Sequence, residues 1–408
     1  MTIPGLPSRL RESLHRLSLL SLVLLLPLVF WTPFNDCFPL PKMLALALFG
    51  GLALVLGPWR IHPAFAWVLP WGAWIIGMAL LGPGVTTIWR SVPDALVLVI
   101  PVFAALSASG IGAGFLRQVS TGLVAVAALI GGYGLSQTFG LDMGSWLSPF
   151  HKGVASTIGN PDLLGGMLVL PFALALSCWL ESRSFYRSLT LAFIGAAIIA
   201  TEARAAWVAA AVVMLVLSAR QNRKALGVVA VSGLVFVSGW LYVHPAALGT
   251  LASGSAMEER LWTWKVSASL IRNHPLAGWG TGSFRTVFLR EQAEKLQSGG
   301  AFHYTEFAHF EPVHLWAETG AVGLGLFLWG LASFFRGWRK GRRMLSEGEW
   351  RGIGAGWAGL LVDGALSFPM HVPPTATPAW VVGGAAIYQG ETSGRCSWRV
   401  RLVAGFES

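Results

Sequence analysis

Charged residues are scarce in this chain of 408 residues. Only 12% are Asp, Glu, Lys or Arg, whereas 54% are hydrophobic and the mean hydropathy is +0.61. A soluble fold with this composition would have more apolar surface than it could bury. Cysteine is scarcer still: Cys37 is expected outside the membrane, Cys178 within a span and Cys396 inside. No two of these thiols are expected to meet in a disulfide.

Signatures of metal, nucleotide and nucleic-acid binding are also missing. The five aspartates form no Asp-X-Asp pair, and no His or Cys cluster has metal-ligand spacing, although carboxylates from separate loops can still converge in a fold. The glycine-rich run 278–282 lacks the Lys-Ser/Thr ending of a P-loop, which favours a tight turn over a phosphate cradle. Aromatic and basic residues are not interleaved as in a nucleic-acid surface. We therefore expect no metal, no cofactor and no nucleic-acid partner.

Long apolar runs are what the chain has instead. Each covers roughly 16–22 residues, enough to cross a hydrocarbon core of about 30 Å. We expect an all-α, polytopic integral membrane protein that forms a single membrane domain over residues 1–408, with no separate soluble domain. About twelve transmembrane helices are predicted, at 17–32, 43–57, 64–82, 93–110, 119–140, 161–180, 186–201, 204–218, 225–243, 312–335, 352–370 and 376–390.

Lysine and arginine are distributed unevenly over the short loops. If the N-terminus is cytoplasmic, most of them fall on the cytoplasmic side, including the cluster from Arg336 to Arg351. This bias predicts that both termini are cytoplasmic and that the large loop 244–311, between the ninth and tenth helices, is external. The net charge of +10 comes mainly from this asymmetry, and the basic turns suit anionic membrane lipids.

The loop 244–311 is the most polar part of the chain. Its Arg, His and Glu residues, held at a bilayer surface, indicate a place for chemistry on a lipid-borne polar substrate. Arg260 either pairs with neighbouring acids on an interfacial helix or binds an anion. Arg204, at the outer end of a predicted span, either pairs with Glu202 or reaches the interface, or it faces water or an anion.

His309 is one candidate for a general base. It lies three residues before Pro312, and proline is favoured in the first turn of a helix. The positive end of that helix disfavours the protonated imidazole and leaves it available as a base. Spacing alone does not choose among this residue and its rivals, which are His303, His314, His371, Glu306, Glu311 and Glu318.

Other polar residues near the predicted outer surface have two interpretations each. Asn160 and Asp162 start a span, where capping the helix is favoured over contact with a ligand. Asp363, inside the eleventh predicted span, needs a partner or a proton. His371 returns the chain to the outer face and can line a cavity. Tryptophans stack on sugars or form an interfacial belt, and the relevant ones are residues 262, 264, 279 and 316.

Several of these segments together resemble the O-antigen ligase superfamily, which also holds O-antigen polymerases and bacterial oligosaccharyltransferases that act on protein. The resemblance covers the whole topology and is most specific across 258–323. In one departure, Phe310 stands where the ligases usually have Asn, Ser or Gln after the essential His. The matching segments are Ser156 to Asp162, Arg204 before Ala205-Ala206-Trp207, Arg260-Leu261-Trp262, His274 to Gly282, and His309 followed by Glu318-Thr319-Gly320 and Gly323.

The resemblance implies glycosyl transfer at the periplasmic face of the bacterial inner membrane, with 244–311 as the catalytic loop. The donor would be a glycan on undecaprenyl diphosphate, and the acceptor a hydroxyl of lipid A-core or another surface glycolipid. His309 would be the base and Arg204 and Arg260 would hold the diphosphate, because guanidinium forks neutralise phosphate without a metal. The reaction would invert the anomeric centre. Possible cavity residues are Asn160, Glu318 and His371.

Other functions remain open at this point. A polysaccharide polymerase would use a second carrier-linked glycan as acceptor, and a protein O-oligosaccharyltransferase would use Ser or Thr. Residue chemistry does not separate these, and ligase stands first because the motifs fit it and no added soluble domain suggests protein recognition. A transporter of a small anion or a lipid-linked sugar is disfavoured, because the ionisable residues gather at the outer edge and no clear internal repeat is present.

Overall fold

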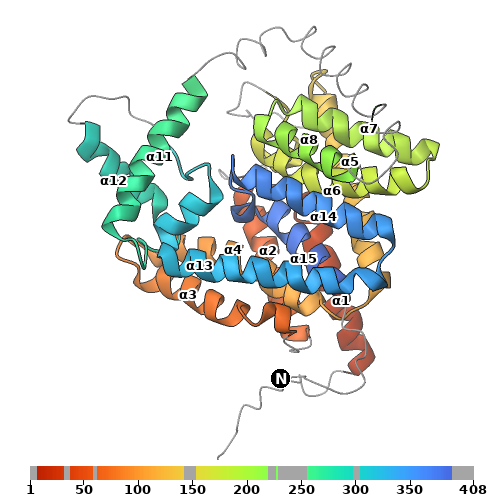
Figure 1. Ribbon diagram of the computed structural model, residues 1–408, viewed down its shortest axis with the longest axis horizontal. Helices are drawn as coiled ribbons and strands as arrows, with labels where there is room; N and C mark the ends of the chain where they lie inside the picture. Colours follow the sequence, from red (N-terminus) through yellow and green to blue (C-terminus); the bar gives the residue numbers. More distant parts are fainter. Residues whose placement is uncertain are drawn as a thin grey trace, which may run out of the picture.

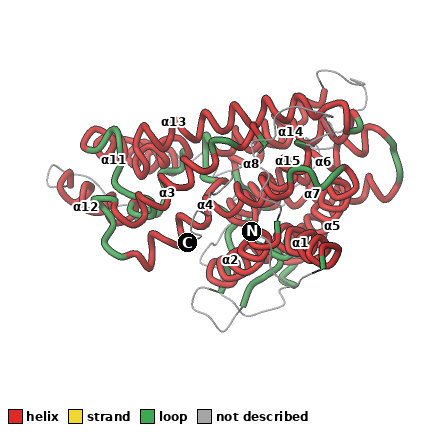
Figure 2. The backbone as a smooth tube through the Cα atoms, turned by 90° about the horizontal axis from the view of Figure 1, so that it is seen from below, coloured by secondary structure: helices red, strands yellow, loops and turns green. Residues whose placement is uncertain are grey.

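The computed structural model describes residues 7–31, 37–57, 62–141, 153–218, 227, 255–296 and 304–387. Within these ranges the regular secondary structure is helical and no strand is present, which confirms the predicted all-α class (Figure 2). The α-helices are α1 (Ser8–Leu24), α2 (Pro39–Leu56), α3 (Val68–Leu81), α4 (Ile88–Ala108), α5 (Ala113–Gln137), α6 (Pro161–Glu181), α7 (Phe185–Ala200), α8 (Arg204–Ser218), α11 (Ser255–Asn273), α12 (Phe284–Leu296), α13 (Glu311–Lys340), α14 (Glu347–Gly364) and α15 (Pro373–Ala386).

In the part of the chain that the structure describes, six helical segments are long and apolar enough to cross a membrane, and two shorter apolar helices accompany them. The first, eleventh and twelfth predicted spans overlap α1, α14 and α15, whereas the ninth, 225–243, lies outside the described residues. The number twelve and the orientation therefore stay predictions. The six segments are Pro39–Leu56, Pro63–Leu81, Ile88–Ala108, Ala113–Gln137, Pro161–Glu181 and Glu311–Lys340, and the shorter ones are Phe185–Ala200 and Arg204–Leu217.

Helix α6 lies in the interior of the bundle. In its most apolar stretch 78% of the residues are buried, compared with 39% in the corresponding stretches of α2 and of α5. Helix α6 packs on α5, α7, α8 and α14. Small residues allow this close packing. A Cβ added to Gly359 of α14 would lie 2.7 Å from the Val169 side chain and 2.8 Å from that of Val213. Glycine at such contacts is typical of helices that pack inside a membrane.

The described part of the predicted polar loop 244–311 contains two helices, and Arg260 lies on the first of them. Helices α11 and α12 pack on each other at one end of the bundle, beside the start of α13 (Figure 1). They bury a small apolar cluster of their own, which consists of Val266, Leu270, Phe284, Val287, Phe288, Ala308 and Ala317. Through Ala308, this apolar cluster holds the polar segment 304–310 against α11 and α13.

Candidate active site

His309 lies in the short segment that enters α13. Its backbone has φ +51°, in the left-handed region that residues other than glycine rarely adopt. The imidazole contacts the Phe368 ring edge to face, with 5.3 Å between the ring centroids. Burial, and then the guanidinium of Arg260, lower the pKa of His309 from 6.5 to about 4. The imidazole is therefore neutral at physiological pH and has a lone pair to offer as a base.

The three residues named from sequence share one electrostatic neighbourhood. Arg260 comes from α11 and Arg204 is the first residue of α8, and both side chains are half-buried. Each guanidinium interacts electrostatically with Asp162, in the first turn of α6. Arg260 also interacts with His309 and with Asp363 of α14. Two cations, a neutral imidazole and two carboxyl groups, which come from α6, α8, α11, α14 and the segment before α13, are thus linked by electrostatic interactions.

The local sequence fixes the start of α8 next to α6. The Ala203 amide donates to Thr201 Oγ1 over 3.2 Å just before the helix. Gly165 of α6 lets this turn approach, because a Cβ there would lie 2.9 Å from the Ala203 Cβ. At the start of α6, Asn160 Oδ1 accepts hydrogen bonds from the amides of Asp162, at 2.8 Å, and Leu163, at 3.4 Å. Asn160 therefore caps α6, as the sequence favoured.

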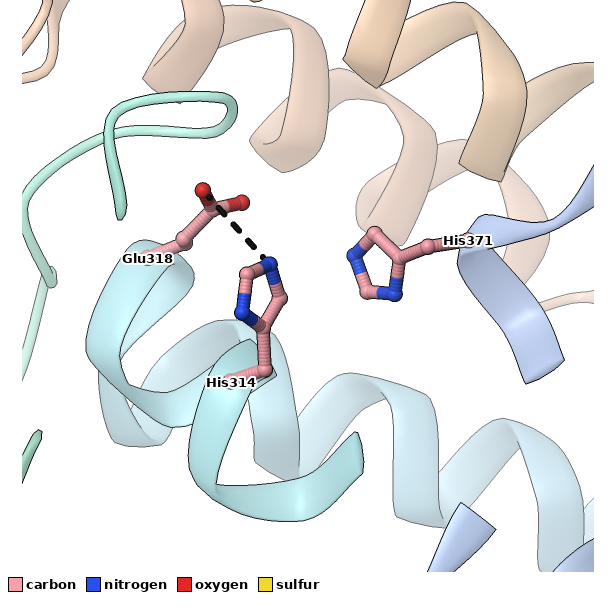
Figure 3. A group of neighbouring side chains, drawn as sticks. All are labelled: His314, Glu318 and His371. Atoms are coloured by element: carbon pink, nitrogen blue, oxygen red, sulfur yellow. Dashed lines mark ion pairs between the residues drawn. The ribbon is translucent and has the colours of Figure 1, made fainter. Parts of the chain in front are cut away.

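His314 and Glu318 lie one turn apart on α13, and His371 faces them from the segment that precedes α15 (Figure 3). His314 Nε2 is 3.7 Å from Glu318 Oε1, and the two His rings are 4.5 Å apart between centroids. The three side chains are buried, and one possible metal-ligand atom from each lies within 4.8 Å of the others. Among the residues described, this group has the composition closest to a metal site.

All three side chains already have protein partners, and those of Glu318 and His314 are backbone amides. Glu318 Oε1 accepts a hydrogen bond from the Phe284 amide at 3.0 Å. His314 Nδ1 accepts one from the Ala308 amide at 3.3 Å, which places the proton of the neutral ring on Nε2, facing Glu318. A metal bound to His314 Nε2 would require that proton to move to Nδ1. There it would face the N–H of Ala308, and the hydrogen bond between the two would be lost. The geometry fits a hydrogen-bonded network better than a cation site.

The closest partner of His371 is Glu311, outside this group of three. Its Nδ1 lies 2.6 Å from Glu311 Oε1, and the Met370 amide donates to Glu311 Oε2 at 3.1 Å. Burial lowers the pKa of His371, but the Glu311 carboxylate, helped by Glu318 and Asp94, outweighs this and raises it. The His371 side chain, expected to line a cavity, is only 5% exposed and is held in an ion pair.

The glycine-rich segment is a turn, as expected, and it docks on α13. The amides of Trp279 and Gly280 donate to the carbonyls of Ala317, at 2.9 Å, and Glu318, at 2.8 Å. Helix α13 opens here because Gly320 has φ +68° and ψ −178°. The break lets the helix exchange backbone hydrogen bonds with the turn, which fixes Glu318 beside His314.

Aromatic residues cover the remaining side of the segment. Trp264 Nε1 donates to the Ala308 carbonyl at 3.0 Å, and the Trp264 ring lies 5.8 Å from the Phe310 ring. Phe310 therefore packs on α11, where the related ligases usually have a polar residue. The indole N–H groups of three other tryptophans also bond to protein partners, and these are Trp262, Trp279 and Trp316.

The helices and this site define a polytopic membrane protein with a buried polar centre beside its helical bundle. Residues 189–328 match the family described as O-antigen ligase. This match confirms the superfamily resemblance predicted from the sequence and covers Arg204, Arg260 and His309. A comparison with curated proteins found no match.

Sequence reasoning missed two contacts of this centre. It treated Glu311 and His371 as rival bases, whereas the structure pairs them with each other. It also gave no role to Phe368, which lies against His309. The only local signal was the run Phe368-Pro369-Met370-His371, in which a proline turn brings an aromatic and an imidazole close together in the chain. His303, another rival base, lies outside the described residues.

Proposed function

We propose that this protein is a membrane glycosyltransferase of the O-antigen ligase type. It transfers a glycan from undecaprenyl diphosphate to a hydroxyl of lipid A-core or another surface glycolipid, at the periplasmic face of the inner membrane. The observation that carries the proposal is the neutral His309 next to Arg260, with Arg204 and Arg260 both close to Asp162. The match of 189–328 to the O-antigen ligase family supports the same chemistry.

In this mechanism the acceptor hydroxyl gives its proton to His309 as its oxygen bonds to the anomeric carbon of the glycan. The bond from that carbon to the diphosphate oxygen breaks at the same time, so the anomeric centre inverts. Arg204 and Arg260 stabilise the negative charge that grows on the departing diphosphate. The leaving group then needs no acid, and the proposed reaction uses no metal.

The electrostatics suit this order of events. In the free protein, Asp162 offsets the charge of the two guanidinium groups. A bound diphosphate would add negative charge near Arg260 and so raise the pKa of His309 toward its usual value. Because a base works best when its pKa is near the operating pH, donor binding would make His309 a stronger base when the acceptor is attacked.

The acceptor class is tested by mass spectrometry of carrier-linked glycans and surface glycolipids from cells with and without the gene. Long chains stranded on the carrier in the deletion strain are the result expected for a ligase. Single repeat units stranded there would instead identify a polymerase. Unchanged pools of both kinds would contradict the proposal and favour a protein acceptor or transport.

A further inference from the structure

The pair Glu311–His371 and the aromatic pair Phe307–Phe368 join the same two segments. Glu311 and Phe307 flank His309 where the chain enters α13. His371 and Phe368 lie at the two ends of the turn that precedes α15. The Phe307 and Phe368 rings are stacked, with centroids 4.0 Å apart and planes inclined by 10°. The turn thus holds the His309 segment on both sides of His309.

The ion pair is sealed from solvent. The side chains of His371 and Glu311 are 5% and 7% exposed, and the second oxygen of Glu311 accepts the Met370 amide. His371 also touches the rings of Phe307, at 5.7 Å, and His314, at 4.5 Å between centroids. A charge pair enclosed in this way is costly to bury. It is unlike the exposed pair that Glu306 of the same segment makes with Arg285 of α12.

His309 needs such support. Its φ of +51° is sparsely populated for a residue with a Cβ, and a conformation of this kind persists only where surrounding contacts hold it. Ala308 and Phe310, on either side of it, contact Trp264 of α11, and the next anchors along the chain are Phe307 and Glu311, each two residues away. The Phe368 ring, which stacks on Phe307, also packs against the imidazole of His309.

We propose that Glu311 and His371 are positioning residues, which hold His309 in the orientation for proton transfer without touching the substrate. This inference rests on the proposed function of His309 as base. A base misplaced by about 1 Å can cost 10²-fold in rate, so loss of the pair should act on turnover rather than on substrate binding.

The test uses the full-length protein in liposomes, with an undecaprenyl diphosphate-linked glycan as donor. We expect Glu311→Gln and His371→Gln each to lower kcat about 10- to 100-fold, with an unchanged KM for the donor. The double variant should lose no more kcat than either single one, because the two residues act as a unit. Glu306→Gln, which removes the exposed carboxylate bonded to Arg285, is the matched control and should keep kcat.

Thermal unfolding of the same variants separates positioning from stability. Each single variant leaves a buried ionisable group that must either give up its charge or keep it without a partner, whereas the double variant leaves two neutral amides, so the double should be the more stable. Turnover that stays low in the double variant supports positioning, and turnover that recovers with stability overturns it. Phe368→Leu leaves the ion pair intact but removes the aromatic ring that packs against His309, so it should also lower kcat.

Two further results would overturn the inference. A raised KM with unchanged kcat in His371→Gln would mean that His371 contacts substrate, and unchanged kcat in all these variants would mean that the pair does not position His309. Failure of the proposed function is recognised separately, since His309→Ala would then keep its activity whatever the pair variants show.

Discussion

Arg260 and His309 come from different elements, and the guanidinium lies close enough to the imidazole to disfavour its protonation. The same guanidinium interacts with Asp162 and Asp363, so a single arginine of α11 links the proposed base to two buried helices. Leaving-group stabilisation and proton transfer would therefore be coupled through one side chain.

Replacement of His309 by alanine should abolish transfer. A positioned base contributes about 10²–10⁴-fold to rate, and rates measured with purified protein should fall by at least that much. His274→Ala is the control, because His274 packs edge to face on Trp279 rather than against Phe368. Activity retained in His309→Ala would move the base to His303, His314 or a glutamate.

Arg204→Lys and Arg260→Lys should each lower kcat/KM by about tenfold or more. Lysine keeps the charge, but its ammonium is a point charge and does not reproduce the two parallel hydrogen bonds of a guanidinium fork on phosphate. Arg285→Lys, at the exposed ion pair with Glu306, should leave the rate near that of the unchanged protein. Near-normal rates in the first two variants would assign both arginines a structural role.

The pH dependence of kcat/KM should show an acid limb well below 6.5. The pKa of His309 is lowered to about 4 by burial and by Arg260, so the free protein keeps its base unprotonated down to that range. Arg260→Gln removes one cause and should move the limb to higher pH. An unchanged limb in this variant would mean that another group titrates.

Stability should follow the same titration. The pKa of His309 is lower in the folded protein than its ordinary value of 6.5. As pH falls from about 6.5 to about 4, the unfolded chain binds a proton that the folded one does not, so the free energy of unfolding decreases in this window. His309→Gln should remove this part of the pH dependence in thermal unfolding curves.

The sequence was sufficient for these helices because long apolar runs indicate membrane helices directly, and α2 to α8 each overlap one of the expected ranges. It also singled out His309, Arg204 and Arg260, whose motifs carry the family resemblance. The pairing of Glu311 with His371 and the docking of the 274–282 turn on α13 were not predictable, because contacts between distant segments have no local pattern in a single sequence.

Gly320→Ala should destabilise the protein and reduce transfer. Gly320 has φ +68°, and an added Cβ would collide with the Leu276 carbonyl, so the turn and α13 would have to separate. The strain alone is worth roughly 1–3 kcal/mol, visible as a lower unfolding temperature. Gly325→Ala lies on the same helix with open space around its Cβ and should be neutral or slightly stabilising. Equal unfolding temperatures for the two variants would contradict the docked arrangement, because of these two glycines only Gly320 faces the turn that bonds to the Glu318 carbonyl.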